Sequence, residues 1–328
     1  MKLTATRRHL LLGAGALLAL PATLRRASAQ DAPLRVAGLH ASPVENAWNS
    51  RIHLALQQAA EQGLISYEFS EGIAATDYPR AMREYAEAGA QLIWGESYAV
   101  ENEARKVAAD YPETAFLMGS SGEPAGDNFG TFGTYNHEAA YLAGMLAANV
   151  SQTGKFGSVG AYPIPEVNLL INAFRAGVLE VNPDATFSNA FIGAFFDPAR
   201  AKEAAIAQID AGADIVFGER IGTADAAQER GAKAIGSLTD YGPRYPETVF
   251  ANAVWNFSPT VEAVVADIRA GNPVGKSYTE YSFMRNGGNE LVYNPDMVPA
   301  EAIPAMEARR EEITSGAFEV PIDPAEPS

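Results

Sequence analysis

The sequence has 328 residues, is 47% hydrophobic, and carries 40 acidic residues against 24 basic ones, a formal charge of -16. So acidic a chain repels phosphate backbones and anionic lipid headgroups, which argues against nucleic acid as a partner. The absence of cysteine excludes disulfides, thiolate metal sites, cysteine nucleophiles and a lipid-bearing cysteine.

Residues 1–29 have the pattern of a cleaved signal peptide. Lys2, Arg7 and Arg8 precede the apolar run HLLLGAGALLALPA, and the segment ends in the small residues ASA. The arginine pair also resembles a twin-arginine export signal, although Thr6 and Leu11 depart from that pattern, so an ordinary secretory signal stays an alternative. Removing this segment takes away five cations and leaves 19 against 40 acids, a formal charge of -21. We therefore expect a soluble protein exported to the periplasm.

From Leu34 onward, short β-branched or aromatic runs alternate with longer segments of helical period. The predicted strands are 34–40, 65–71, 90–96, 114–120, 128–134, 154–162, 186–194, 213–219, 232–237 and 248–255. The predicted helices are 47–63, 77–89, 101–112, 138–151, 167–183, 197–212 and 223–231. This alternation predicts parallel sheets flanked by helices. Ten strands exceed one ordinary sheet of about five or six, so we predict two α/β lobes.

One stretch occurs twice, as AGAQLIWGE at 88–96 and AGADIVFGE at 211–219. The helix before each copy begins at an aspartate, Asp77 or Asp197, which is expected to cap it. Each helix ends at a glycine, Gly89 or Gly212, which is expected to turn the chain into a buried strand. The two stretches are therefore predicted to be equivalent parts of two similar lobes.

Each copy of this stretch ends in a glutamate, Glu96 or Glu219. Because ligands sit beyond the carboxyl ends of parallel strands, the two glutamates are expected to face each other across one cleft. The alternative is that both simply follow a strand into solvent, as charged loop residues often do.

No local motif for catalysis is present. A nucleophile elbow, a Walker loop, a zinc-binding HExxH and a dinucleotide fingerprint are all absent. Beyond residue 29 the histidines His40, His53 and His137 occur singly, so no metal or cofactor is expected. Glu96 and Glu219 could form an acid–base pair, which leaves hydrolysis open as an alternative.

Aromatic residues gather at predicted strand ends and the turns that follow: Trp48, Trp94, Tyr98, Tyr135, Phe195, Phe196 and Trp255. Flat side chains bury a flat ligand well, and polar neighbours can bind its edge. Those neighbours are Asn49, Glu96, Asn136, Glu219, Asp240 and Asn256. The combination favours a planar heterocycle over a phosphate or a sugar acid, although Trp94 and Phe195 fit core packing equally well.

An ordered series of motifs between Leu34 and Pro321 resembles the basic membrane protein (BMP) family of ABC-transporter substrate-binding proteins, which includes purine nucleoside receptors. The motifs are SPVENAWNSRIHLALQQA, KVAADYPETAFL, NHEAAYLAGMLAA, GSVGAYPIPEVNLLINAFRAGV, FFDPARAKEAAIAQIDAGADIVFG, GAKAIG and EEITSGAFEVP. The resemblance implies the type I periplasmic binding-protein fold, with two doubly wound parallel-sheet lobes joined by a three-crossover hinge. On that template the N-terminal lobe holds 31–135 plus 256–281, the C-terminal lobe holds 136–255 plus 282–318, and 319–328 form a tail.

The resemblance also carries site positions onto this chain. Trp48 and Asn49 match the aromatic and amide at the start of the family's first helix, and Phe196 matches the aromatic wall before its Asp-Pro helix. Where nucleoside-binding members place an acidic residue and a lysine for the ribose, this chain has Leu238 and Trp255. The expected ligand-binding residues are Trp48, Asn49, Glu96, Tyr98, Tyr135, Phe196, Glu219, Asp240 and Trp255.

We therefore predict a monomeric receptor without catalytic activity that binds a purine nucleobase or related heterocycle, closes by its hinge, and is recognised by an ABC permease. A purine nucleoside receptor is one alternative, and a periplasmic hydrolase acting on nucleosides is another. Transport and sensing would use the same cleft, so the sequence leaves both open.

Overall fold

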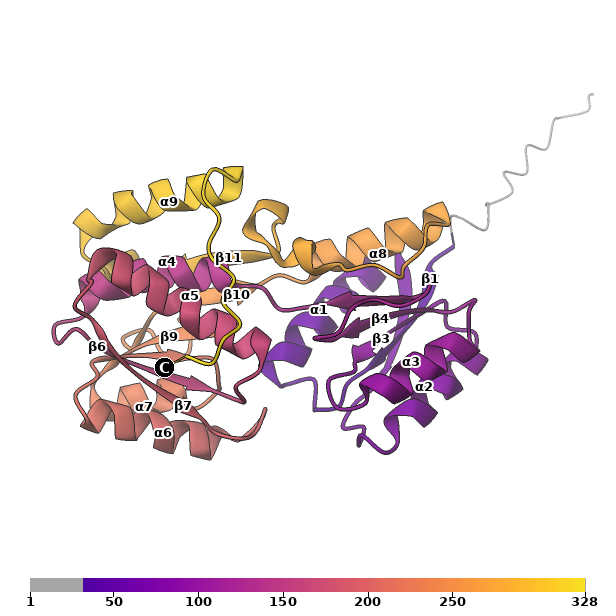
Figure 1. Ribbon diagram of the computed structural model, residues 1–328, viewed down its shortest axis with the longest axis horizontal. Helices are drawn as coiled ribbons and strands as arrows, with labels where there is room; N and C mark the ends of the chain where they lie inside the picture. Colours follow the sequence, from indigo (N-terminus) through magenta and orange to yellow (C-terminus); the bar gives the residue numbers. More distant parts are fainter. Residues whose placement is uncertain (1–31, 328) are drawn as a thin grey trace, which may run out of the picture. The chain divides into compact units, whose positions relative to one another are not determined.

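Two parallel sheets organise the computed structural model, which describes residues 32–327 (Figure 1). The predicted signal peptide, 1–29, lies outside the described residues. The first sheet has the order β2-β1-β3-β4-β5, all parallel. Its strands are β1 (Leu34–Leu39), β2 (Ile65–Ser70), β3 (Leu92–Glu96), β4 (Ala115–Gly119) and β5 (Phe129–Phe132).

The second sheet has the order β11-β10-β9-β8-β6-β7, and β11 alone runs antiparallel to its neighbour. Its strands are β6 (Lys155–Gly160), β7 (Thr186–Phe191), β8 (Ile215–Gly218), β9 (Lys233–Leu238), β10 (Val249–Trp255) and β11 (Asn289–Tyr293). In both sheets the strand order reverses direction partway, which is the doubly wound topology. This confirms the predicted fold class of two α/β lobes.

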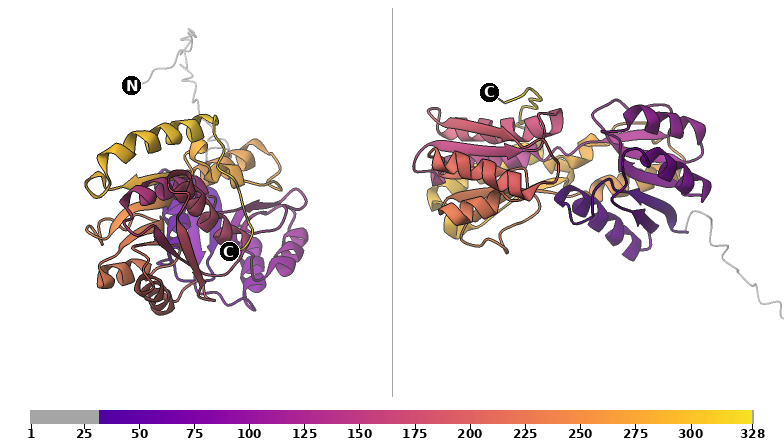
Figure 2. Two further views of the ribbon diagram at one scale, coloured as in Figure 1. Left: turned by 60° about the vertical axis from the view of Figure 1, so that its left-hand side comes forward. Right: turned by 90° about the horizontal axis from the view of Figure 1, so that it is seen from below.

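Helices cover both faces of each sheet, as the alternating pattern predicts (Figures 1 and 2). On the first sheet α1 (Ala47–Glu61) and α8 (Ser258–Ala270) share one core, while α2 (Tyr78–Glu87) and α3 (Glu101–Asp110) share the other. On the second, α4 (His137–Val150), α5 (Pro165–Val181) and α9 (Ile303–Ser315) pack on one face, and α6 (Pro198–Asp210) and α7 (Thr223–Arg230) on the other.

The chain passes between the lobes three times. The first crossing joins β5 to α4, the second joins β10 to α8, and the third leads from Ser277, which bridges to Thr131, to β11. Asn289 ties two of these crossings together, because its amide donates to the carbonyl oxygens of Tyr135 and Ser282 at 3.3 and 2.7 Å. This is the three-crossover connection expected for the fold.

Besides four short 3-10 helices between residues 279 and 302, two α-helices and one strand of the described residues go beyond the predicted elements: α8, α9 and β11. β11 has five residues on a sheet edge, and α9 buries only Met306 and Ile313 within the helix, so neither shows a strong periodic pattern. α8 does carry one, since Val261, Val264 and Val265 are buried at helical spacing.

The predicted helix boundaries of the repeated stretch hold in three of four places. Gly89 and Gly212 have φ of 86° and 105°, which a residue with a side chain rarely adopts. Asp197 accepts a hydrogen bond from the Arg200 N–H at 3.0 Å and caps α6. The capping prediction for Asp77 is wrong, because its side chain accepts no backbone N–H of the first turn of α2. Its φ of -96° and ψ of -15° are already helical, whereas a capping residue usually has extended backbone.

Candidate ligand-binding site

A cavity of about 190 Å³ lies where the carboxyl ends of both sheets meet. The first lobe and its crossing contribute Ala41, Ser42, Asn46, Trp48, Asn49, Ala75, Tyr78, Glu96, Tyr98, Ala99, Val100 and Thr134. The second lobe contributes Ile164, Glu166, Val167, Leu170, Phe195, Glu219, Arg220 and Leu238. Apolar and aromatic side chains make up twelve of these twenty residues, and the eight polar or charged ones are the groups that can orient a ligand.

Trp48 is held rigidly at the start of α1. Its backbone N–H donates to the side chain of Asn46, the N-cap residue, at 3.1 Å, and its indole N–H donates to Thr134 Oγ1 at 2.7 Å. Behind it stack Phe132 and Trp255, with ring centroids 5.8 and 6.0 Å away and interplanar angles of 16° and 28°. The ring is thus fixed in place by packing before any ligand arrives, which limits the entropy that binding would cost.

Glu96 ends β3 with its carboxylate in the cavity wall. Its Oε1 accepts the Ala41 N–H at 3.0 Å, and its own N–H donates to the Tyr78 hydroxyl at 2.7 Å. Within residues 32–327 no donor contacts its second oxygen, Oε2. Burial raises the pKa of Glu96, because the charged form loses water that one backbone N–H only partly replaces.

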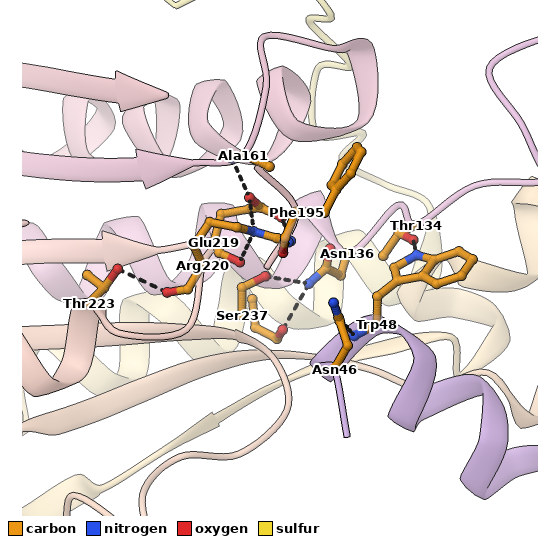
Figure 3. Close-up of polar contacts among 11 residues, drawn as sticks. Asn46, Trp48, Thr134, Asn136, Ala161, Phe195, Glu219, Arg220, Thr223 and Ser237 are labelled. Carbon is orange, nitrogen blue, oxygen red and sulfur yellow. Dashed lines mark hydrogen bonds and ion pairs between the residues drawn. The ribbon is translucent and has the colours of Figure 1, made fainter. Parts of the chain in front are cut away.

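Glu219 follows β8 on the opposite wall, but its carboxylate is already paired. Oε2 accepts the Ala161 N–H at 3.1 Å and Arg220 Nε–H at 2.7 Å, while Oε1 pairs with Arg220 Nη2 (Figure 3). Burial raises the pKa of Glu219, and the guanidinium beside it opposes that rise. Arg220 also donates to the carbonyl oxygen of Phe195. Backbone groups therefore bind both members of the pair, Ala161 on the glutamate and Phe195 on the arginine.

Glu166 is a third carboxylate of the cavity, and the sequence reasoning missed it. It lies in the first turn of α5, where it is 9% exposed, and both its oxygens accept the Ser121 hydroxyl at 3.0 Å. Burial raises its pKa. A usable signal exists in PEV at 165–167, since Pro at a first helical position followed by Glu is typical of a helix N-terminus.

Five of the nine expected ligand-binding residues line this cavity: Trp48, Asn49, Glu96, Tyr98 and Glu219. The Asn49 amide donates to the carbonyl oxygen of Ser42 at 2.8 Å and so shapes the loop before α1. Burial and the nearby Glu166 raise the pKa of Tyr98 well above its usual range, so its hydroxyl stays a neutral donor. Phe196 lies in an adjoining hollow with 53% of its surface exposed, and its neighbour Phe195 lines the cavity instead.

The remaining three expected residues lie elsewhere. Trp255 is fully buried at the end of β10, behind Trp48, because a central strand has no solvent on either face. Asp240 is exposed beside a separate hollow and accepts hydrogen bonds from the Asn252 amide and the Gly242 N–H, both at 2.8 Å. Tyr135 packs at the first crossing against His137 and Phe283, with ring centroids 6.0 Å away in both cases.

Leu238 has a backbone conformation that marks this end of β9. With φ of 72° it is the one non-glycine residue with positive φ among those the structure describes, and its side chain is buried in the cavity wall. Positive φ costs a branched side chain free energy and gathers at binding sites. Asp240, two residues on, does not line this cavity and lies beside the separate hollow.

Sequence reasoning also missed Asn46, Thr134 and Arg220. Asn46 is recognisable as an N-cap before a helix, and Arg220 follows directly on the repeated stretch, whereas nothing local distinguishes Thr134. Among residues 32–327 no cluster of three or more His, Asp or Glu could hold a metal ion. Over the same range, no helix is long and apolar enough to cross a membrane.

Comparison with known proteins bears on the family. The family model described as an ABC transporter substrate-binding protein, PnrA-like, matches residues 39–323. A protein of Haloferax volcanii named as an ABC transporter glucose-binding protein is 33% identical over 206 residues, or 61% of this chain and 52% of that protein. A purine-binding protein of Brucella abortus is 33% identical over 198 residues, or 60% and 56%. The chain thus spans about half the length of these two relatives.

A solved structure agrees on the fold. An ABC transporter solute-binding protein from Aeropyrum pernix K1 matches with a TM-score of 0.74 at 20% identity, covering 89% of this chain and 94% of that one. That likeness, together with the two parallel-sheet lobes, confirms the type I periplasmic binding-protein fold. Since the family model covers most of the sequence, the chain belongs to the Bmp family of PnrA-like ABC transporter substrate-binding proteins.

Proposed function

We propose that this protein is a receptor that binds a purine nucleobase or a related planar heterocycle between its lobes and releases it unaltered. The observation that carries the proposal is the pairing of a fixed indole, Trp48, with a carboxylate, Glu96, that has one oxygen open to the same cavity. An indole face and an open acceptor are complementary to a flat ring that carries N–H donors.

The size and lining of the cavity support a base over larger ligands. About 190 Å³ is below the roughly 300–1,000 Å³ typical of sites for drug-sized ligands. Val100, Val167 and Leu170 supply apolar walls suited to ring carbons. A sugar would need hydrogen-bond partners for hydroxyls around its whole rim, because buried hydroxyls without partners are costly.

The edge of the ligand would meet polar groups from both lobes. Glu96 can accept from ring or exocyclic N–H groups, and the Asn46 amide nitrogen, which has no partner within residues 32–327, can donate to a ring nitrogen or carbonyl (Figure 3). Glu166 lies on the far wall. Contacts from both walls would favour the closed form, since a ligand shifts a hinge equilibrium only by its differential affinity for the two states.

A ligand panel tests the proposal. Thermal unfolding with adenine, guanine, hypoxanthine, cytosine, adenosine, inosine and glucose would identify the ligand class, because a tight ligand raises the unfolding temperature by mass action. We expect a free purine base to give the largest shift, followed by its nucleoside. A shift with glucose alone, the ligand for which one relative is named, would overturn the proposal.

The same ligands test the enzymatic alternative. A hydrolase acting on nucleosides would release free base on incubation, whereas a receptor returns its nucleoside intact. The structure gives Glu219 little freedom for acid–base work, because Arg220 and the Ala161 N–H already bind its carboxylate. We therefore expect chromatography to show no released base over many hours at stoichiometric protein.

Delivery to an ABC permease from the periplasm is part of the proposal, supported by family membership. Deleting the gene and supplying a nucleobase as sole purine source tests it: loss of growth supports transport, and unchanged growth with a lost transcriptional or motile response would indicate sensing instead. A single symmetric peak at the monomer mass in light scattering is expected for the isolated protein.

A further inference from the structure

Glu166 belongs to the cavity wall and at the same time contacts the opposite lobe. It is carried by α5 of the second lobe, while Ser121, whose hydroxyl it binds at 3.0 Å, follows β4 of the first. Away from the three crossing segments, the described residues 32–327 have one other hydrogen bond between the lobes, from Arg51 Nε–H of α1 to the carbonyl oxygen of Trp255 in β10 at 2.6 Å. Over that range, the bond between Ser121 and Glu166 is the one that joins two side chains. A group that touches both the ligand space and the opposite lobe can couple the two.

Ser121 is mounted firmly on its own lobe. The adjacent Ser120 hydroxyl donates to Glu101 at 2.8 Å and accepts the Gly122 N–H at 2.8 Å. Arg105 in turn binds the same glutamate through its Nε–H at 2.8 Å. The loop that presents Ser121 is therefore fixed by contacts within the first lobe, and the Ser121 hydroxyl is left to reach across.

Glu166 is mounted equally firmly on the second lobe. Two residues further along α5, the Asn168 amide donates to the carbonyl oxygen of Pro324 at 2.9 Å, and four residues beyond that the Asn172 amide donates to the carbonyl oxygen of Asp323 at 3.0 Å. These bonds hold the C-terminal segment along the helix and fix the helix against it. With both ends fixed, the distance from Ser121 to Glu166 changes only when the lobes move.

We propose that Glu166 is the closure-coupling residue of this receptor: its carboxylate binds Ser121 of the facing lobe and faces the ligand, so ligand affinity depends on that contact. This deepens the proposed function and rests on it for the ligand. The ligand is the heterocycle with N–H donors proposed above. Glu166 accepts a hydrogen bond from it on the wall of the second lobe and at the same time binds the Ser121 hydroxyl of the first lobe. Ser121 does not line the cavity, so any effect of Ser121 on affinity must act through lobe closure.

The affinity test uses adenine as the probe in calorimetry. We expect Ser121→Ala to raise Kd about 5-fold, the loss of one partly exposed charge-assisted hydrogen bond. Ser66→Ala, the same exchange at an exposed site on β2 of the first lobe, away from the cavity, should leave Kd within 2-fold. In a Glu166→Gln background, Ser121→Ala should cost much less than it does alone, because contacting residues are not additive. An unchanged Kd for Ser121→Ala, or the same cost in both backgrounds, refutes the coupling.

A second measurement works without any ligand. The chain has no native cysteine, so spin labels at Glu103→Cys and Glu203→Cys, exposed sites on α3 and α6, report the separation of the lobes. Ser121→Ala and Glu166→Gln should both shift the distance distribution toward longer values, and Ser66→Ala should not. Identical distributions in all four proteins refute the coupling. If the wild-type protein binds no heterocycle while the label distances shift as expected, the ligand proposal fails and the coupling stands.

Discussion

Replacing Glu96 with Gln should weaken ligand binding and stabilise the empty protein. A charge-assisted hydrogen bond contributes about 1.5–3 kcal/mol and a neutral one about 0.5–1.5 kcal/mol. Exchanging one for the other therefore costs about 1–1.5 kcal/mol of binding, or roughly 5- to 15-fold in Kd. The amide oxygen can still accept the Ala41 N–H, so the loop before α1 should keep its shape. Calorimetry with the best base of the panel measures the loss.

The stability half of this prediction follows from the direction of the pKa shift. Burial raises the pKa of Glu96 above its unfolded value, so the ionised form opposes folding. That penalty is absent below the unfolded pKa and grows as pH rises through the folded one. Glu96→Gln should therefore raise the unfolding temperature at pH 7 and change it little near pH 4. Glu68→Gln, the same exchange at an exposed site of the same lobe, is the control. An unchanged Kd for Glu96→Gln, or an equal loss in the control, would refute the assigned contact.

Four further predictions test the remaining structure. Trp48→Ala should cost about 1–3 kcal/mol of base stacking, roughly 5- to 150-fold in Kd by calorimetry. Asp240→Asn should leave Kd unchanged, because the residue lies beside a separate hollow. A raised Kd for this variant would show that Asp240 does belong to the binding site. Gly177→Ala should lower the free energy of unfolding in urea by about 1–3 kcal/mol or more, because the added Cβ would collide with the backbone of Tyr141 where α4 and α5 pack together. Burial lowers the pKa of His40 to about 4, below its unfolded value of 6.5. The free energy of unfolding should therefore fall by about 3 kcal/mol as pH drops from above 6.5 toward 4. In His40→Asn, urea unfolding at several pH values should show a smaller fall.

Much of the fold was predictable because its signals are local. Ten strands and seven helices follow from apolar runs and helical spacing, and the turns at Gly89 and Gly212 follow from glycine's freedom at positive φ. Asp77 and Asp197 show the limit of such reasoning. The same residue type before a Pro-containing helix caps one helix and not the other, because capping depends on the φ and ψ of the preceding turn, which distant packing sets.

The site was less predictable, because whether an aromatic residue faces a ligand depends on layers that the sequence does not order. The ring centroids of Trp48 and Trp255 lie 6.0 Å apart in one stack, yet Trp48 lines the cavity whereas Trp255 is buried behind Trp48. No local pattern separates the two. Similarly, Leu238 lines the cavity with a positive φ whereas Asp240, two residues on, lies beside a separate hollow, and no pattern in β9 predicts either position.

The repeated glutamate has a structural explanation that the duplication alone could not supply. In the first lobe Glu96 ends β3 and accepts the N–H of Ala41, just beyond the neighbouring β1. In the second, Glu219 follows β8 and accepts the N–H of Ala161, just beyond the neighbouring β6. Each glutamate thus ties together two strand ends at the cavity, which is a role both lobes need whatever they bind.

The two copies differ in what their carboxylates can still do. Arg220 supplies two further donors to Glu219, whereas Glu96 keeps one oxygen without a donor among residues 32–327. A carboxylate already paired by a guanidinium gains little from another donor, so we expect the first lobe to recognise the ligand through its copy and the second through a different residue. Glu166 is the carboxylate left on that wall, and its own bond to Ser121 gives it the link to closure that Glu219, bonded wholly within its lobe, does not have.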